Sequence, residues 1–374
     1  MKRIIAAAVL TVAMSVQAQN NNGGISAEML DEIRNGYSDT PAEKAVRNAL
    51  AGQSIAVLAV NADNAAMIDT HFSNRVLTKG ITDQKSSGRC WLFTGLNVLR
   101  AKMIAKHDLG EFTFSQNYVS FYDLLEKSNL FLQAMIDNSK SDITDRKVDW
   151  LFQNPIGDGG QFTGVANLIA KYGIVPADAM PETYSSNNTA QMSKLISLKL
   201  REYGLELREM GKQKGMTDAK LEKRKIEMLE TVYRMLALNF GVPPAEFTWT
   251  RKNAKGEPVE TKTYTPKSFY EEFVNEDFSK YYMIMNDPTR EYYKVYEIEY
   301  DRHVYDGKNW RYLNLPMEEI AEMAIASIKD STMMYFSCDV AKFLNREKGF
   351  MDINNYDYGS LMGTTFNMNK EQRV

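Results

Sequence analysis

Residues 82–91 read Thr82-Asp83-Gln84-Lys85-Ser86-Ser87-Gly88-Arg89-Cys90-Trp91, and a helical pattern follows from Cys90 to about Lys106. The first half of that pattern is apolar on nearly every side, which is typical of a helix buried in a core. Ser87 and Gly88 stand immediately ahead of it, so we expect Cys90 in its first turn. Unpaired backbone N–H groups and the positive end of the helix dipole stabilise a thiolate there, and the thiolate is the nucleophilic form of cysteine.

Position alone leaves two interpretations of Cys90 open. In the first, Cys90 is a nucleophile, and Gln84 directs its side-chain amide toward it. The Gln84 amide and the Cys90 backbone N–H would then form a two-donor oxyanion hole. In the second, Cys90 is a structural residue of a core helix, because free cysteine is among the most buried residue types.

The run from Gln84 to Trp91 resembles the active-site signature of papain-like cysteine proteases, in which a glutamine and five residues precede Cys-Trp at a helix start. With Leu92 and Phe93 added, it closely resembles the bleomycin hydrolase and aminopeptidase C branch. Further segments similar to that branch are Asp69-Thr70-His71-Phe72-Ser73, Asp158-Gly159-Gly160-Gln161, Lys171-Tyr172-Gly173-Ile174-Val175-Pro176 and Phe336-Ser337-Cys338-Asp339-Val340. The resemblance extends from about residue 28 to the last residue. It implies an α+β, papain-like fold of two lobes.

The resemblance also implies an activity and a set of site residues. It assigns Cys90 as the nucleophile and Gln84 to the oxyanion hole of a cysteine-type aminopeptidase that acts on peptide substrates by acyl transfer, without a cofactor. It further implies a homo-oligomer, a hexamer in the family. Nothing in the residues themselves distinguishes aminopeptidase from endopeptidase action.

The pair Gly159-Gly160 is a candidate substrate-binding element for a physical reason of its own. Glycine lacks a Cβ atom, so an extended substrate backbone can lie close to it and form hydrogen bonds. A plain turn explains a Gly-Gly pair equally well.

A cysteine peptidase needs a general base, which is usually a histidine oriented by an asparagine or an aspartate. The chain contains only His71, His107 and His303. His71 lies in a segment similar to a non-catalytic family motif, and His303 lies beside a predicted hairpin turn at Asp306-Gly307. His107 is at the far end of the Cys90 helix, about 25 Å away at a rise of ~1.5 Å per residue.

In the family that this sequence resembles, the catalytic histidine and asparagine follow all the segments named above. We therefore expect a chain that is truncated before its base, with the barrel lobe incomplete and with little or no peptidase activity. The alternative is a non-catalytic module that binds peptides or supports assembly.

We expect four parts along the chain. Residues 1–18 have the pattern of a signal peptide, with Lys2 and Arg3 ahead of an apolar run. Residues 19–190 form an N-terminal part with the helix that carries the catalytic cysteine. Residues 191–245 form a helical hairpin, which corresponds to the family's inserted hook, and residues 246–374 begin a β-rich lobe.

Within these parts, the apolar pattern gives more detailed expectations. The hairpin has one apolar stripe at Ile196, Leu200, Tyr203, Leu207 and Met210, although an ordinary solvated helix pair shows the same pattern. In the β-rich lobe, alternation at Tyr296, Ile298 and Tyr300 predicts a strand, residues 316–329 a helix, and residues 333–336 a short buried strand.

Composition excludes several classes of function. A net charge of −3 gives no general attraction to nucleic-acid phosphates, and no compact basic patch is present, so no nucleic-acid partner is expected. Three scattered histidines and two distant cysteines offer no metal-ligand spacing, so we expect no metal. The apolar run near the N-terminus is shorter than the ~20 residues that span a bilayer. We expect no membrane span after signal cleavage, an exported protein, periplasmic or secreted, and two separate thiols at Cys90 and Cys338.

Overall fold

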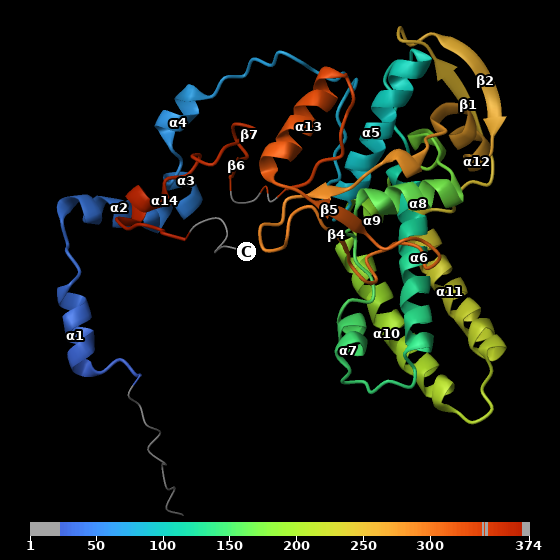
Figure 1. Cartoon of the computed structure of the whole chain (residues 1–374), viewed down its shortest axis with the longest axis horizontal. Coiled ribbons are helices and arrows are strands. Elements are labelled where there is room, and N and C mark those ends of the chain that lie inside the picture. The colour runs from blue at the N-terminus through green and yellow to red at the C-terminus, as the bar shows by residue number, and fades with distance from the viewer. Residues whose placement is uncertain (1–22, 339, 341–342, 369–374) are drawn as a thin grey trace, which may run out of the picture. The chain divides into compact units, whose positions relative to one another are not determined.

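The structure is a computed structural model that describes residues 23–338, 340 and 343–368 (Figure 1). The chain divides into two units. Unit 1 comprises Met1–Asp69 and Val340–Asn367, and unit 2 comprises Thr70–Asp339 and Met368–Val374. The predicted signal peptide, residues 1–18, lies outside the described residues.

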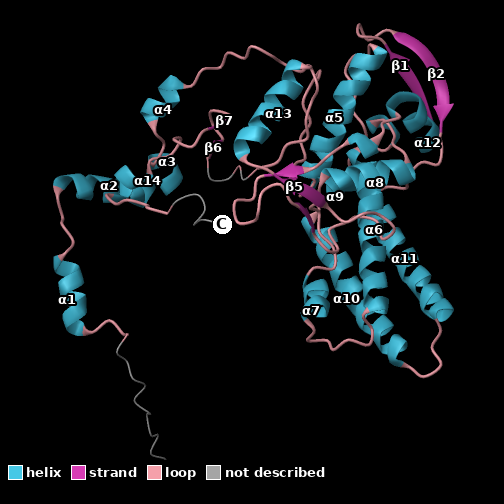
Figure 2. Cartoon of the chain, viewed as in Figure 1, coloured by secondary structure: helices cyan, strands magenta, loops and turns pink. Residues whose placement is uncertain are grey.

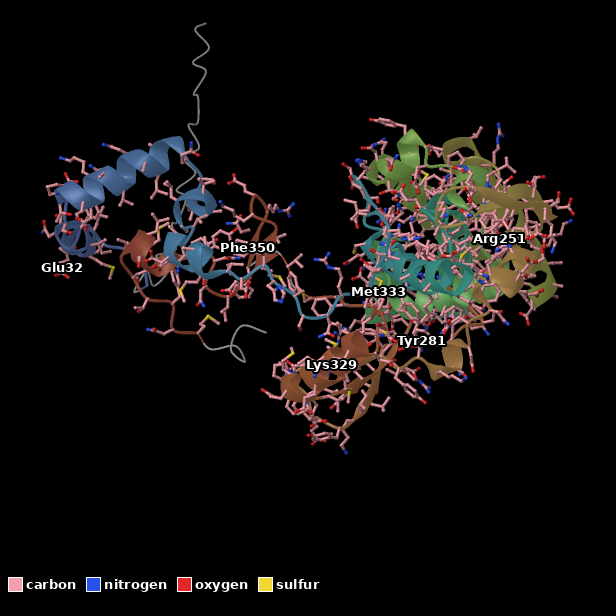
Figure 3. All side chains as sticks on the ribbon, turned by 90° about the horizontal axis from the view of Figure 1, so that it is seen from above. Glu32, Arg251, Tyr281, Lys329, Met333 and Phe350 are labelled. Carbon is pink, nitrogen blue, oxygen red and sulfur yellow. The ribbon has the colours of Figure 1, made fainter. Side chains whose placement is uncertain are left out.

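Three helices form the centre of unit 2: α5 (Cys90–His107), α6 (Gln116–Asp137) and α8 (Phe162–Tyr172). As predicted, α5 is buried on nearly all sides, and Trp91, Leu92, Leu96 and Leu99 belong to one continuous core. The side chains are densely packed around these helices (Figure 3). This burial fixes the place where α5 begins.

The ends of these helices follow local sequence signals. Ser115 caps α6 by accepting a hydrogen bond from the backbone N–H of Tyr118. The helix continues to Asp137, and its buried positions continue as far as Met135. Gly173 ends α8 with a φ of 76°, and a Cβ atom there would lie 2.3 Å from the carbonyl carbon of Pro266.

The predicted helical hairpin is present as α10 (Ala190–Lys212) and α11 (Asp218–Phe240), and both helices pack on α6 (Figure 1). Four residues of the apolar stripe, from Ile196 to Leu207, are buried and the fifth, Met210, is half-buried. Gly215 has a positive φ of 82° in the turn, and Thr217 caps α11. The stripe is therefore the face that joins the hairpin to the core.

Strands are short and few (Figure 2). The antiparallel pair β1 (Phe247–Lys252) and β2 (Pro258–Tyr264) forms one sheet. A second sheet has the order β3-β5-β4, in which β5 (Arg311–Asn314) is parallel to β3 (Ile284–Met285) and antiparallel to β4 (Val295–Glu297). Mixed helices and sheets confirm the α+β class, and the sheets of the described residues form no closed barrel.

Two strand predictions are wrong. The strand expected at Tyr296, Ile298 and Tyr300 stops at Glu297, because Tyr300 has a positive φ of 62°, which ends an extended backbone. Residues 333–336 form no strand, since no described residue pairs with their backbone. Consequently Phe336, which we expected to be buried, has 69% of its surface exposed.

Helix α13 (Met317–Lys329) agrees with the prediction, but none of its residues is buried. Its apolar side chains Ile320 and Ile328 are thus not buried by the described part of the chain. The remaining elements of unit 2 are α7 (Arg146–Gln153), η1 (Ala177–Ala179), α9 (Tyr184–Asn187), α12 (Pro266–Phe269), the π-helical turn η2 (Tyr270–Val274) and η3 (Phe278–Lys280).

Unit 1 combines segments that are far apart in the sequence. It contains α1 (Ala27–Asn35), α2 (Pro41–Gly52), α3 (Ile55–Leu58), α4 (Ala62–Met67), β6 (Leu344–Asn345), β7 (Phe350–Met351) and α14 (Tyr358–Met362). A β-bridge between Val60 and Tyr356 joins the two segments. Of its described residues only Ala59, Asn345 and Asn355 are buried, so unit 1 has a very small core. In the described residues of either unit, no helix has the length and apolar character that a membrane span requires.

Candidate active site

Cys90 is the first residue of α5 and is exposed. The residue before it, Arg89, is the N-cap and makes no side-chain capping hydrogen bond, so no capping side chain covers the helix end beside the thiol. Cys338 is also exposed, and both cysteines are free, which confirms the prediction of two separate thiols. An exposed side chain at this position does not fit a cysteine packed inside a core helix.

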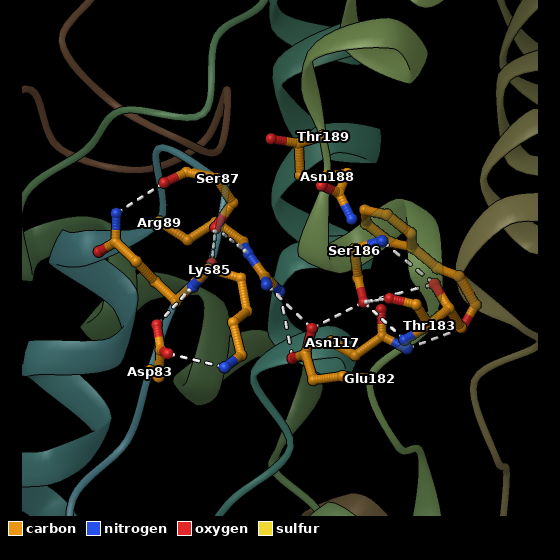
Figure 4. Close-up of polar contacts among 12 residues, drawn as sticks. Asp83, Lys85, Ser87, Arg89, Asn117, Glu182, Thr183, Ser186, Asn188 and Thr189 are labelled. Atoms are coloured by element: carbon orange, nitrogen blue, oxygen red, sulfur yellow. Dashed lines mark hydrogen bonds and ion pairs between the residues drawn. The ribbon is translucent and has the colours of Figure 1, made fainter.

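Arg89 anchors the segment before Cys90. Its side chain is 1% exposed and makes a two-pronged ion pair with Glu182, with Nη2 2.9 Å from Oε2 and Nη1 3.2 Å from Oε1. Arg89 Nε also donates to Ser87 Oγ, and Glu182 accepts from Ser186 Oγ (Figure 4). A planar guanidinium suits this two-pronged contact, so the backbone just before the thiol is held by a buried charge pair.

Gln84 lies in a tight turn that folds back on itself. Its Nε2 donates to the carbonyl of Ser87 at 2.6 Å, and Ser87 Oγ donates to the carbonyl of Gln84 at 2.7 Å. Lys85, between them, has a positive φ of 52°. The side-chain amide of Gln84 has a second hydrogen for another acceptor. Its role in an oxyanion hole remains a prediction.

Asp158 binds residues on both sides of Cys90. Its carboxylate accepts from the backbone N–H of Gly88 at 3.1 Å, and its carbonyl accepts from Trp91 Nε1 at 2.6 Å. The same carboxylate accepts from Thr189 Oγ1 and Ser193 Oγ at the start of α10. Sequence reasoning did not single out Asp158 as a site residue, although it lies in the quoted segment 158–161.

The two predicted substrate-binding glycines differ in their surroundings. A Cβ atom on Gly159 would meet nothing within 4 Å, so the space beside this residue is open. A Cβ atom on Gly160 would lie 2.2 Å from His303 Cε1 and 2.8 Å from Trp91 Cδ2. Close packing therefore requires glycine at 160, whereas an open surface is present at 159.

His303 has contacts that the sequence did not indicate. The predicted turn beside it is present, with Gly307 N donating to the carbonyl of Val304. The imidazole itself is 3% exposed, its Nδ1 lies 2.5 Å from Asp123 Oδ1, and its ring lies 4.5 Å from the ring of Trp91. No local signal shows this contact, because Trp91 and His303 are far apart in the sequence.

The electrostatics of the pair define its protonation. Burial lowers the pKa of His303, and the nearby Lys127 cation lowers it further. Burial alone would raise the pKa of Asp123, but Lys127 and His303 outweigh burial and the pKa is lowered. The pair is therefore an aspartate and a neutral histidine at neutral pH, and Nδ1 carries the proton because a carboxylate can only accept.

His107 is distant from this region. It ends α5, and its Nε2 lies 3.2 Å from the carbonyl of Phe273. Burial lowers its pKa as well.

Tyr335 is a further aromatic residue near the thiol. Burial raises its pKa to about 12, with a smaller contribution from Cys90. Its ring lies 5.6 Å from that of Phe162, at the start of α8. The predicted buried strand at 333–336 drew attention to this segment for a different reason, and nothing in it indicated proximity to Cys90.

A cavity of about 250 Å³ adjoins the glycines and is lined in part by Lys127, Gly157, Gly159, Asp301 and His303. A larger cavity of about 720 Å³ lies along the second half of α5, beside residues 273–276, and none of the predicted site residues lines it. We place the candidate site at Cys90 and the adjoining loop 157–160, because Asp158 of that loop binds Gly88 and Trp91. Within the described residues, no group of three or more potential ligands could hold a metal ion.

Comparisons with known proteins show what this chain is similar to. The model of the Peptidase C1-like family matches residues 24–374. Aminopeptidase C of Lactobacillus delbrueckii subsp. lactis is 34% identical over 352 residues, which cover 94% of this chain and 78% of that protein. Bleomycin hydrolase of Homo sapiens is 36% identical over 303 residues, covering 79% of this chain and 66% of its own length.

A solved structure shows the same fold. The crystal structure of PepW from Lactobacillus rhamnosis HN001 superposes with a TM-score of 0.89 at 33% sequence identity. The superposition covers 94% of this chain and 79% of that protein. The expected resemblance to the bleomycin hydrolase and aminopeptidase C branch is thus confirmed.

Proposed function

Because this chain belongs to the Peptidase C1-like family of cysteine peptidases, we propose that it hydrolyses peptide bonds through Cys90. The observation that carries this proposal is the exposed thiol at the first residue of the buried helix α5. Asp158 binds the residues on either side of it, Gly88 and Trp91, so the sulfur has a fixed place.

In the proposed reaction, the Cys90 thiolate attacks the scissile carbonyl carbon, and the carbonyl oxygen becomes an oxyanion. The Cys90 backbone N–H and the Gln84 amide stabilise that oxyanion. The amine leaves with a proton supplied by a general acid, and water then hydrolyses the thioester and restores the thiol.

Aminopeptidase action is the finer part of the proposal, and the names of the relatives support it. An aminopeptidase requires a free N-terminal amine, so it should cleave an aminoacyl reporter and not its N-acetylated counterpart. Equal cleavage of both reporters would assign endopeptidase action instead.

The test of Cys90 does not depend on turnover. We expect iodoacetamide to label Cys90 at least about tenfold faster than Cys338, because the start of α5 stabilises the thiolate. Both cysteines are exposed, so neither thiol is closed to the reagent. Peptide mapping by mass spectrometry gives the two rates, and a Cys90→Ser variant identifies the fast site. Equal, slow labelling of the two thiols would contradict the proposal.

A non-catalytic peptide-binding module is the second candidate. The enclosure of His303, whose Nδ1 is bound to Asp123 in the core, favours it because this imidazole is not placed on an open surface. Under this second candidate, slow turnover or none is expected. A module of this kind would bind peptides equally well before and after Cys90→Ala, without cleaving them.

We also propose that the protein is exported. The charge and apolar pattern of residues 1–18 supports this proposal. N-terminal sequencing of the natural protein should then begin at Gln19. A mature protein that keeps Met1 would contradict export by this route.

A further inference from the structure

A charge cluster lies in the core beneath the glycines of the candidate site. It consists of Asp123 and Lys127, one turn apart on α6, together with His303. The side chains of Asp123 and His303 are 3% exposed and that of Lys127 is 12% exposed. A buried ion pair adds little to stability on average, so we looked for another role of this cluster in its contacts.

The ammonium of Lys127 has three hydrogens, and each has an acceptor. Nζ lies 2.8 Å from Asp123 Oδ2, 2.8 Å from the carbonyl oxygen of Gly157 and 2.7 Å from that of Gly159. The carbonyl between them, that of Asp158, accepts from Trp91 Nε1. We call residues 157–160 the glycine loop. Three successive carbonyls of this loop, those of residues 157–159, are thus fixed on the side that faces Lys127 and Trp91.

This arrangement determines where the N–H groups of the glycine loop point. In a trans peptide unit the C=O and the N–H point in opposite directions. Holding the carbonyls of residues 157–159 toward Lys127 and Trp91 therefore turns the N–H groups of residues 158–160 away from them. Within the described residues, the N–H groups of Gly159 and Gly160 donate no hydrogen bond, and the space beside Gly159 is open.

His303 also supports the glycine loop. Its Nδ1–H donates to the carboxylate oxygen of Asp123 that Lys127 does not use. Its ring fills the space under Gly160 and Gly164, where added Cβ atoms would lie 2.2 and 2.6 Å from it. The carboxylate of Asp123 therefore holds the imidazole and the ammonium in one geometry.

We propose that Lys127, Asp123 and His303 are positioning residues. They hold the glycine loop so that its outward N–H groups bind the backbone carbonyl of an extended peptide beside Cys90. This inference rests on the proposed function. It adds the residues that would hold the substrate-binding glycines predicted from the sequence.

The test compares two electrophiles on the full chain. Iodoacetamide needs only the thiolate, whereas a dipeptidyl vinyl sulfone must also bind along the glycine loop before the sulfur adds to its vinyl carbon and water protonates the adjacent carbon. A matched vinyl sulfone carries an E-alkene in place of its inner peptide bond, which keeps the extended shape and lacks the carbonyl acceptor. Rates at Cys90 are measured by mass spectrometry over a range of probe concentrations.

In the unaltered protein we expect the peptide probe to react about tenfold faster than its alkene counterpart, which is the size of effect that one hydrogen bond produces. In Lys127→Met, the peptide probe should label Cys90 about tenfold more slowly at low probe concentration, because it binds more weakly, and its rate at saturation should be unchanged. Its rate should then exceed that of the alkene probe by no more than about threefold. Iodoacetamide labelling should stay within about twofold. Lys127→Arg should restore part of the difference.

Lys171→Met is the matched control, because Lys171 is also paired with a buried carboxylate, Glu126, but does not contact the glycine loop. It should leave both probes unchanged. Equal rates for the two vinyl sulfones on the unaltered protein would overturn the inference, whatever Lys127→Met does to folding. An equal fall of all three labelling rates in a folded Lys127→Met variant would also overturn it. If instead iodoacetamide fails to prefer Cys90 over Cys338, the proposed function itself fails.

Discussion

Gly160 and Gly159 are adjacent in the sequence and occupy opposite environments. We predict that Gly160→Ala destabilises the protein by about 1–3 kcal/mol, because its Cβ atom would overlap His303 and Trp91 in a packed core. Gly159→Ala is the matched control and should leave the free energy of unfolding unchanged, since open space surrounds that position. Urea unfolding of both variants provides the measurement. Equal effects would show that the packing around Gly160 is looser than described.

His303 should make stability depend on pH. Its pKa is lowered in the folded protein, so the unfolded chain takes up more protons as pH falls below its ordinary value of 6.5. Stability is therefore full above about pH 6.5 and is lost as pH falls toward the lowered folded pKa. The pKa of His107 is also lowered, so His107 contributes to the pH dependence of stability in the same direction. The pKa of Asp301 is raised from its ordinary value of 3.8, so Asp301 contributes in the opposite direction and at lower pH.

Unfolding free energies between pH 7.5 and 5.5 check this prediction. We expect the wild-type chain to lose stability across that range, and His303→Gln to be less stable at pH 7.5 but to depend less on pH. His107→Gln should remove only the part of the pH dependence of stability that His107 contributes. Equal pH dependence in the wild-type chain and His303→Gln would contradict the assigned direction. Asp123, which faces His303 and whose pKa is lowered, keeps its charge in this range.

At the scale of elements, the hairpin α10–α11 can be tested through its buried stripe. Leu200→Ala should cost about 2–5 kcal/mol, because the side chain is fully buried against the core. Leu198→Ala removes the same atoms from a side chain that is 64% exposed and should change stability little. Chemical denaturation distinguishes them. A similar cost at both positions would mean that the hairpin is not anchored by this face.

The elements that the sequence predicts well are those whose signals are local. The continuous apolar pattern from Trp91 onward predicts the buried helix α5, and the apolar stripe of the hairpin predicts the face that packs on the core. The structure agrees with both. The strands near Tyr300 and at residues 333–336 were predicted wrongly because a strand depends on its neighbour. The contacts of Asp158, Lys127 and His303 join separate elements, and no periodicity or spacing reveals them.

At the scale of the whole molecule, the two units should open independently. Asn355 is 2% exposed, and its Nδ2 donates to the carbonyls of Phe343 and Phe350 in unit 1. Asn355→Ala leaves both carbonyls without this donor, at a cost of about 1–3 kcal/mol. We expect faster hydrogen exchange at Leu344, Asn345, Phe350 and Met351, with amides of α5 unchanged. Asn354→Ala, at an exposed position, is the control, and equally faster exchange in α5 would contradict independence.

Unit 1 is built from the first 69 residues together with residues 340–367. A ribosome makes the first segment early, but the strand residues and the Asn355 amide that complete the unit appear only after some 270 further residues have been synthesised, at roughly 5–20 residues per second. The helices around Cys90 can therefore pack during translation, whereas the opening helices of the chain wait for their partner segment. We therefore expect unit 1 to acquire its structure after the helices around Cys90.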